Sequence, residues 1–210
     1  MRGLALSVLV LLPVVVAPHH GQAQAQAGAA HPEGSPAAVA DEFHRAIQSM
    51  VWQALADRLH PEALDYLRLA VRINLDADTT GWSLEHLLGG LPDRAAYEAL
   101  DDEAAFVRVM AGVQTEVPGL LSSMVSRRSE VLGTVVEGQD TAHVVYRIVS
   151  LAQGAEPRVR ALTLVRTSQG WKVRFAEEVE VLHTALRRIP IPRPPPGQPS
   201  GPVSGRVTPG

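Results

Sequence analysis

The chain has 210 residues, no cysteine and a formal net charge of −3, and hydrophobic residues make up 46% of it. The lack of cysteine excludes disulfides, cysteine nucleophiles, iron–sulfur clusters and thiolate zinc sites. The near-balanced charge argues against general nucleic-acid binding. Lys172 is the only lysine and lies in no glycine-rich loop of the Walker type, so this class of phosphate site is excluded too.

The first 25 residues have the pattern of an export signal. Arg2 gives a positive start, residues 4–16 form a short apolar run, and Ala23-Gln24-Ala25 is a small-x-small cleavage site. The apolar run is shorter than the roughly 20 residues that a membrane-spanning helix needs. We therefore expect a periplasmic or secreted protein, with no stable membrane span after cleavage. The expected parts are a signal peptide (1–25), a linker (26–35), a single domain (36–189) and a tail (190–210).

Helical periodicity fills the first half of the expected domain. Ser35-Pro36 predicts a helix start, because serine is a good N-cap and proline fits the first helical turn. Another helical run begins at Pro61, and helix is at least as good as strand for its continuation through residues 67–76. Glycines within 76–92 predict a loop with one short turn at 84–88. A third helical region begins at Asp93 and is interrupted at Pro118-Gly119.

The period then changes to that of β-strands. Four runs alternate with period two, namely 129–137, 141–151, 158–166 and 171–181. Short turn-forming connections separate them, so we expect the last three to form an antiparallel meander. A last helical turn is expected at 183–188. From residue 190 the chain is rich in proline and glycine, which predicts an extended, disordered tail that is a spacer or a ligand for a proline-recognising domain.

Alternation divides the meander into two faces. The face expected to pack on the helices carries Ala142, Val144, Tyr146 and Ile148, then Val159, Ala161, Thr163 and Val165, then Trp171, Val173 and Phe175. The other face is basic and aliphatic, and it offers a candidate interface for a dimer or an anionic partner, made of Arg147, Arg160, Leu162, Leu164 and Arg174. A solvated outer face with exposed aliphatic side chains is the alternative.

This order of elements resembles the nuclear transport factor 2-like superfamily, also called ketosteroid isomerase-like or SnoaL-like. The run Ala40-Asp41-Glu42-Phe43-His44-Arg45-Ala46-Ile47 and the break at Leu59-His60-Pro61-Glu62 are similar to its first helices. Ala161-Leu162-Thr163-Leu164-Val165-Arg166 and Gly170-Trp171-Lys172-Val173 are similar to its last two strands. The resemblance implies an α+β fold in which N-terminal helices pack on a curved, cone-like antiparallel meander. In catalytic members the cone encloses an apolar pocket with an acid/base carboxylate.

The sequence contains no complete catalytic or metal-binding motif. His86 and His183 have no partner at metal-ligand spacing, and neither His-Glu-x-x-His nor Gly-x-Ser-x-Gly occurs. His60 precedes a proline and is expected to cap a helix or to be exposed. Glutamates 177, 178 and 180 crowd the end of the last predicted strand, where a solvated edge explains them. We therefore expect no catalytic residue, no metal and no cofactor.

A ligand pocket near Tyr66, Tyr146, Thr163 and Trp171 is the candidate site, although core tyrosines with satisfied hydroxyls are the simpler explanation of Tyr66 and Tyr146. Two functions remain open. The favoured one is an exported, non-catalytic domain that binds a small apolar ligand or an envelope protein, and that can dimerise through the outer sheet face. The alternative is a small acid/base enzyme of the isomerase or cyclase type. A buried carboxylate with a raised pKa would favour the enzyme, and a pocket filled by apolar side chains would favour the binding domain.

Overall fold

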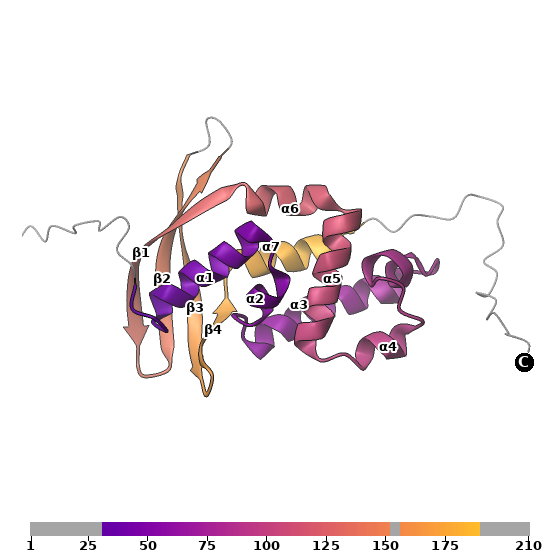
Figure 1. Cartoon of the computed structure of the whole chain (residues 1–210), viewed down its shortest axis with the longest axis horizontal. Coiled ribbons are helices and arrows are strands. Elements are labelled where there is room, and N and C mark those ends of the chain that lie inside the picture. The colour runs from indigo at the N-terminus through magenta and orange to yellow at the C-terminus, as the bar shows by residue number, and fades with distance from the viewer. Residues whose placement is uncertain (1–30, 152–155, 190–210) are drawn as a thin grey trace, which may run out of the picture.

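The computed structural model describes residues 31–151 and 156–189. Within them the protein is α+β, with helices first and a curved, open sheet of four antiparallel strands after them (Figure 1). The expected signal peptide, residues 26–30 of the expected linker and the proline-rich tail lie outside the described residues. In the described part of the chain, no helix is long and apolar enough to cross a membrane.

The first helices begin where their capping residues predict. α1 (Pro36–Ser49) starts after Ser35, whose Oγ accepts a hydrogen bond from the Ala38 amide at 3.2 Å. After the short α2 (Trp52–Ala56), α3 (Pro61–Ala77) starts after His60, whose ring Nδ1 accepts from the Glu62 amide at 3.3 Å. The capping role of His60 and the helix through residues 67–76 are therefore confirmed.

The glycine-rich stretch after α3 contains one turn of π-helix, η1 (Ser83–Leu87), close to the predicted turn. The Asp78 carboxylate organises the loop before it, because it accepts hydrogen bonds from the amides of Thr80, Gly81 and Ser83. Burial would raise the pKa of Asp78, but these hydrogen bonds outweigh it and hold the pKa at about 2. The loop conformation thus depends on an ionised Asp78.

The third helical region is divided into α4 (Arg94–Glu98), α5 (Asp102–Glu116) and α6 (Pro118–Val125). Asp93 and Asp101 cap α4 and α5 through their carboxylates, at 2.8 and 2.7 Å from the amides that they accept. α5 passes very close to η1 at Gly112, where an added Cβ would lie within 3.0 Å of the Leu87 carbonyl oxygen. This close crossing requires glycine.

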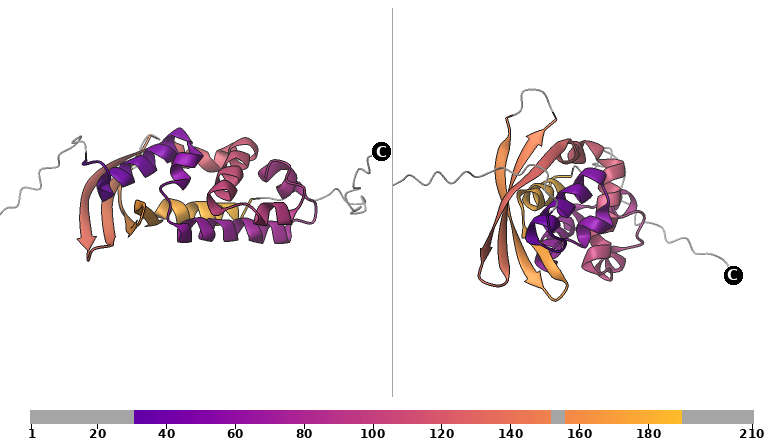
Figure 2. Two further views of the ribbon diagram at one scale, coloured as in Figure 1. Left: turned by 60° about the horizontal axis from the view of Figure 1, so that its bottom comes forward. Right: turned by 60° about the vertical axis from the view of Figure 1, so that its left-hand side comes forward.

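The strands pair in sequence order, as β1 (Arg127–Glu137), β2 (Thr141–Ser150), β3 (Arg158–Thr167) and β4 (Gly170–Phe175). The meander is thus confirmed and includes β1. Both views of Figure 2 show the helices gathered on one face of the sheet. At its β4 edge, the Val173 amide donates to the Arg58 carbonyl at 2.7 Å, and the His60 amide donates to the Val173 carbonyl at 2.8 Å. The segment between α2 and α3 therefore pairs with the middle of β4.

The prediction of a strand over 171–181 is wrong in its second half. The strand ends at Phe175, and α7 (Glu177–Leu186) follows and packs against α3. The buried residues Val179, Leu182 and Leu186 recur at three- and four-residue spacing, which is helical. The glutamates lie in the first turn of α7, where negative charge favours the positive end of the helix dipole.

The predicted faces of β3 are also wrong. Leu162 and Leu164 are fully buried, opposite Val144 and Ala142, whereas Thr163 faces the outer side opposite His143. Both alternations of this strand carry aliphatic side chains, and the one with Leu162 and Leu164 also carries arginines, so periodicity alone does not choose the correct face. Burying two leucines removes more apolar area from water than burying alanine and threonine, and this decides the face.

Candidate functional site

The four residues expected to line one pocket do not come together. Tyr146 is fully buried between sheet and helices, whereas Tyr66 and Thr163 line a surface groove of about 490 Å³ beside β4. Trp171 lies at the edge of the core, with the Arg166 guanidinium 5.9 Å from its ring centre. The predicted pocket is therefore divided between the interior and the surface.

Tyr146 belongs instead to a buried polar cluster that the sequence analysis missed. Its hydroxyl donates to the Glu178 carboxylate, at 2.9 Å from Oε2 and 3.1 Å from Oε1. His44 of α1 packs against both, with its ring centre 4.4 Å from that of Tyr146 and its Nε2 3.9 Å from Glu178 Oε1. Glu178 is 8% exposed, so a solvated edge does not explain it.

Burial shifts the pKa of each member of this cluster. It raises the pKa of Glu178 above its usual range, although the Tyr146 hydroxyl partly opposes this shift. Burial also raises the pKa of Tyr146, and the neighbouring Glu178 adds to that rise. The pKa of His44 falls to about 4, again because of burial, so the ring is neutral near pH 7. His44 and Glu178 are thus neighbours without forming a salt bridge.

The space beside this cluster is too small for an organic substrate. His44, Ile47, Met124, Ile148 and Glu178 line a cavity of about 20 Å³, which has room for about one water molecule. Large apolar side chains fill the rest of the interior and are less than 2% exposed, among them Phe43, Leu87, Leu88, Met110, Leu162 and Leu164. The interior is therefore a packed core.

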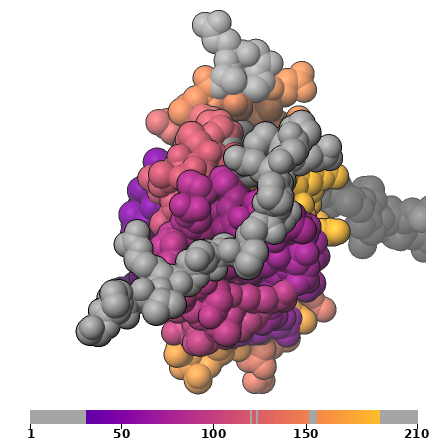
Figure 3. Space-filling view, turned by 90° about the vertical axis from the view of Figure 1, so that its right-hand side faces the viewer, coloured from indigo at the N-terminus to yellow at the C-terminus, as the bar shows by residue number. Residues whose placement is uncertain are grey.

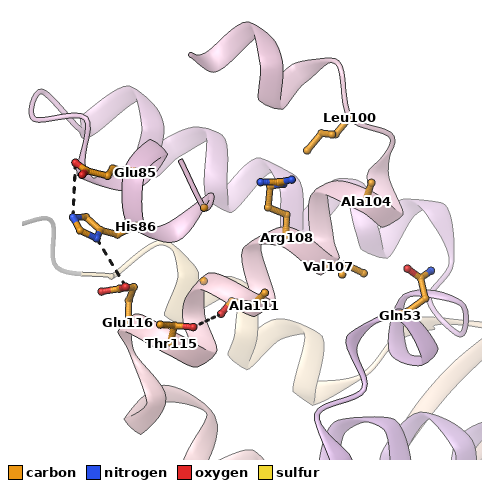
Figure 4. Close-up of a pocket in the computed structure, with 12 residues that line it drawn as sticks. Gln53, Glu85, His86, Leu100, Ala104, Val107, Arg108, Ala111, Thr115 and Glu116 are labelled. Atoms are coloured by element: carbon orange, nitrogen blue, oxygen red, sulfur yellow. Dashed lines mark hydrogen bonds and ion pairs between the residues drawn. The ribbon is translucent and has the colours of Figure 1, made fainter. Parts of the chain in front are cut away.

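A surface groove of about 690 Å³ lies beside α5 (Figure 4). We call it the α5 groove, and it lies between α5, η1, the α4–α5 connection and Gln53 of α2. Its lining consists of Gln53, Glu85, His86, Gly89, Leu100, Ala104, Val107, Arg108, Ala111, Gly112, Thr115 and Glu116. Its lining residues all belong to the helical part of the chain, and Figure 3 views the molecule from the end where the helices lie.

The α5 groove has an apolar part and a charged part. Ala104, Val107 and Ala111 recur at three- and four-residue spacing, so they lie on one face of α5 with Leu100 beyond them. At the other end, the His86 ring lies between two carboxylates, with 3.9 Å from Nε2 to Glu85 and from Nδ1 to Glu116. The α5 groove thus combines an apolar surface with groups that can orient a ligand.

A buried arginine fixes the wall of the α5 groove near Leu100. Arg68 of α3 is 7% exposed and donates to the carbonyls of Leu100 at 2.9 Å and Tyr97 at 3.1 Å. It also donates to the Asp102 carboxylate at 2.6 Å, so one guanidinium links α3 to both sides of the α4–α5 connection. This part of the α5 groove is preformed.

The candidate interface of five residues does not form one basic and aliphatic patch. Leu162 and Leu164 lie in the core, which contradicts their assignment to the outer face. Each of the three arginines has a carboxylate partner, Glu130 for Arg147, Glu177 for Arg160 and Glu62 for Arg174. Arg160 also lies opposite Tyr146 in the sheet, on the inner face.

The outer sheet face nevertheless carries exposed aliphatic side chains. Val135 is 60% exposed and Val159 is 54% exposed, opposite His143 and Arg147 respectively. Val159 was expected on the inner face, because the face of β3 was misassigned, and no face was predicted for Val135 of β1.

Among the described residues, no three His, Cys, Asp or Glu side chains converge in a way that could hold a metal ion. The chain offers an acidic and aromatic cluster in its core, a preformed groove among its helices, and a partly aliphatic outer sheet face. Comparisons of this chain with protein-family models, with curated proteins and with solved structures give no match.

Proposed function

We propose that this protein is a non-catalytic binding domain that holds a small, largely apolar ligand in the α5 groove. The observation that carries the proposal is the contrast between two spaces, about 20 Å³ in the interior and about 690 Å³ beside α5. Ligand pockets generally measure about 300–1,000 Å³ and are mostly apolar with a few polar groups. The α5 groove has this size and composition, and the space inside the cone does not.

The test is thermal unfolding of the protein with a panel of small apolar acids, alcohols and sterol-like compounds. A ligand at a hundred times its dissociation constant adds about 2.7 kcal/mol to the free energy of unfolding. In a domain of this size that corresponds to a rise in Tm of about 5–10 °C. Ala111→Phe places a large ring in the α5 groove and should abolish the rise.

Ala77→Phe is the matched control, because Ala77 is also an exposed helical alanine but lies outside the α5 groove. It should leave the rise in Tm unchanged. A ligand that stabilises the Ala111→Phe variant as much as the original protein would contradict the proposed site.

We also propose that the chain is exported and has the nuclear transport factor 2-like fold. The residue pattern of 1–25 supports export, and the order of helices followed by a curved, open antiparallel sheet supports the fold. Expression in a bacterium with a fractionated envelope tests export. A periplasmic protein whose mass corresponds to a start near residue 26 is expected, and an uncut cytoplasmic chain would contradict it.

The second candidate function is acid/base catalysis at Glu178, favoured by a buried carboxylate with a raised pKa beside Tyr146 and His44. A substrate would have to separate α1 from β1, because the present cavity holds about one water. Proton exchange of small 1,3-dicarbonyl compounds in D₂O tests this chemistry. Exchange that Glu178→Gln abolishes would support the enzyme, and equal exchange with both proteins would contradict it.

A further inference from the structure

One cation in the α5 groove stands apart from the other arginines of its surroundings. Arg68, Arg72 and Arg94 each form ion pairs with carboxylates. Arg108 of α5 lines the α5 groove and has no carboxylate within ion-pair distance among the described residues. Its charge is therefore not neutralised by the part of the chain that the structure describes.

A backbone contact holds this guanidinium in place. Arg108 Nη1 donates to the Leu88 carbonyl at 3.1 Å, which ties the side chain to the end of η1. Gly89 lies beside it, and a Cβ added at Gly89 would be 3.4 Å from Nη1. A guanidinium has five N–H donors, and this contact uses one of them. The remaining donors of a tethered guanidinium can bind a carboxylate, to which its planar fork is well matched.

The surroundings of Arg108 determine where the rest of a ligand would lie. Figure 4 shows Arg108 between the apolar side chains of Leu100, Ala104 and Val107 on one side and the Glu85–His86–Glu116 group on the other. The two carboxylates disfavour an anionic group at their end. The apolar part of a ligand can lie on the opposite side, where no carboxylate repels the ligand and where it would cover the apolar surface of the groove.

We infer that the ligand of the α5 groove is a small apolar acid whose carboxylate binds Arg108 and whose apolar body lies toward Leu100, an inference that rests on the proposed function. Three observations carry it: an unneutralised guanidinium, its tether to the Leu88 carbonyl, and an apolar surface next to it. The carboxylate of the ligand is recognised by its charge. Its apolar body binds because apolar surface is removed from water.

The experiment is calorimetric titration of the protein with decanoate and with decanol, each kept below the concentration at which it aggregates. Decanoate should bind at least about 10-fold more tightly, because a hydrogen bond to a charged partner is worth roughly that factor or more. Arg108→Gln should reduce decanoate affinity to near that of decanol and should weaken decanol binding much less, because the alcohol carries no charge. Arg45→Gln is the control, since Arg45 is an exposed arginine of α1 outside the α5 groove.

The outcomes separate this inference from the proposed function. If Arg108→Gln leaves decanoate affinity unchanged while Ala111→Phe abolishes binding, the role of Arg108 is overturned and the α5 groove remains the site. If Ala111→Phe does not weaken decanoate binding, the ligand binds elsewhere and both proposals are overturned. If neither compound binds the original protein, the inference is overturned.

Discussion

The buried cluster of Tyr146, Glu178 and His44 shows how polar side chains in a small core affect the stability of the protein. The Tyr146 hydroxyl donates to Glu178, while neither buried ring nitrogen of His44 meets a partner at hydrogen-bonding geometry in the part of the chain that the structure describes. A buried polar group without a partner lowers the free energy of unfolding. Tyr146 and His44 should therefore affect stability in different ways.

Tyr146→Phe should destabilise the protein by about 1–3 kcal/mol at neutral pH, because it removes the hydroxyl that donates to the buried Glu178 carboxylate. The pKa of Glu178 should rise further, so the loss should grow as the pH rises above the usual range of a carboxyl group. Urea denaturation at several pH values measures it. In the double variant Tyr146→Phe/Glu178→Met the effect of the tyrosine change should largely disappear, and additive losses would contradict the coupling.

His44 should make stability fall in mild acid. Its pKa is lowered to about 4 by burial in the folded protein and is about 6.5 in the unfolded chain. Above pH 6.5 the ring is neutral in both states. As the pH falls from 6.5 toward 4, the unfolded chain takes up a proton that the folded protein does not, which stabilises the unfolded state. The contribution amounts to about 3 kcal/mol at pH 4.

Comparison with His44→Phe isolates this contribution, because Glu178, whose pKa is raised, acts in the opposite direction and is present in both proteins. The unfolding free energy of the original protein should fall relative to that of His44→Phe between pH 7 and pH 4. Parallel pH profiles would mean that His44 takes up its proton in the folded state.

At the scale of elements, capping residues and periodicity predicted α1, α3 and the positions of the strands, because both act over a few neighbouring residues. The end of β4 and the face of β3 were not predictable in this way. Residues 176–181 alternate like a strand, and tertiary packing of Val179 and Leu182 makes them a helix. In β3 the choice depends on which side chains bury more area.

The same two errors explain why the candidate site was predicted incorrectly. Glu178 becomes buried only when residues 177–186 form α7, and Thr163 leaves the core only when Leu162 enters it. A helical period applied to residues 178–186 would have placed Glu178 on the face of Leu182. No sequence pattern would have shown the α5 groove, because it depends on how η1, α2 and the α4–α5 connection are placed around α5.

Gly112→Ala should destabilise the protein by more than about 1 kcal/mol, because the new Cβ would collide with the Leu87 carbonyl at the crossing of η1 and α5. Replacing an unobstructed helical glycine by alanine usually raises the free energy of unfolding by about 0.5–1 kcal/mol. Gly119→Ala in α6 is the control, since a Cβ there meets nothing within 4 Å. Thermal unfolding of both variants measures the difference, and equal behaviour would mean that η1 moves away from α5 without cost.

For the molecule as a whole, the aliphatic outer face of the sheet predicts a dimer. Val135 and Val159 are more than half exposed there, and no described helix covers that face (Figure 2). Ala161→Glu would place a charge on this face, opposite Val145, and should convert the dimer to a monomer in light scattering after gel filtration. Ala77→Glu, on α3, should not. A monomeric original protein at all concentrations would show that this face is solvated.

The pairing of the segment between α2 and α3 with β4 has a consequence for misassembly. Both backbone groups of Val173 are engaged by Arg58 and His60, so the middle of this edge has no free amide or carbonyl to offer to a strand of another molecule. Adding such a strand would first require the segment to detach, and His60 would then leave the start of α3. Resistance to fibre growth at this edge should therefore last as long as the helical layer stays folded.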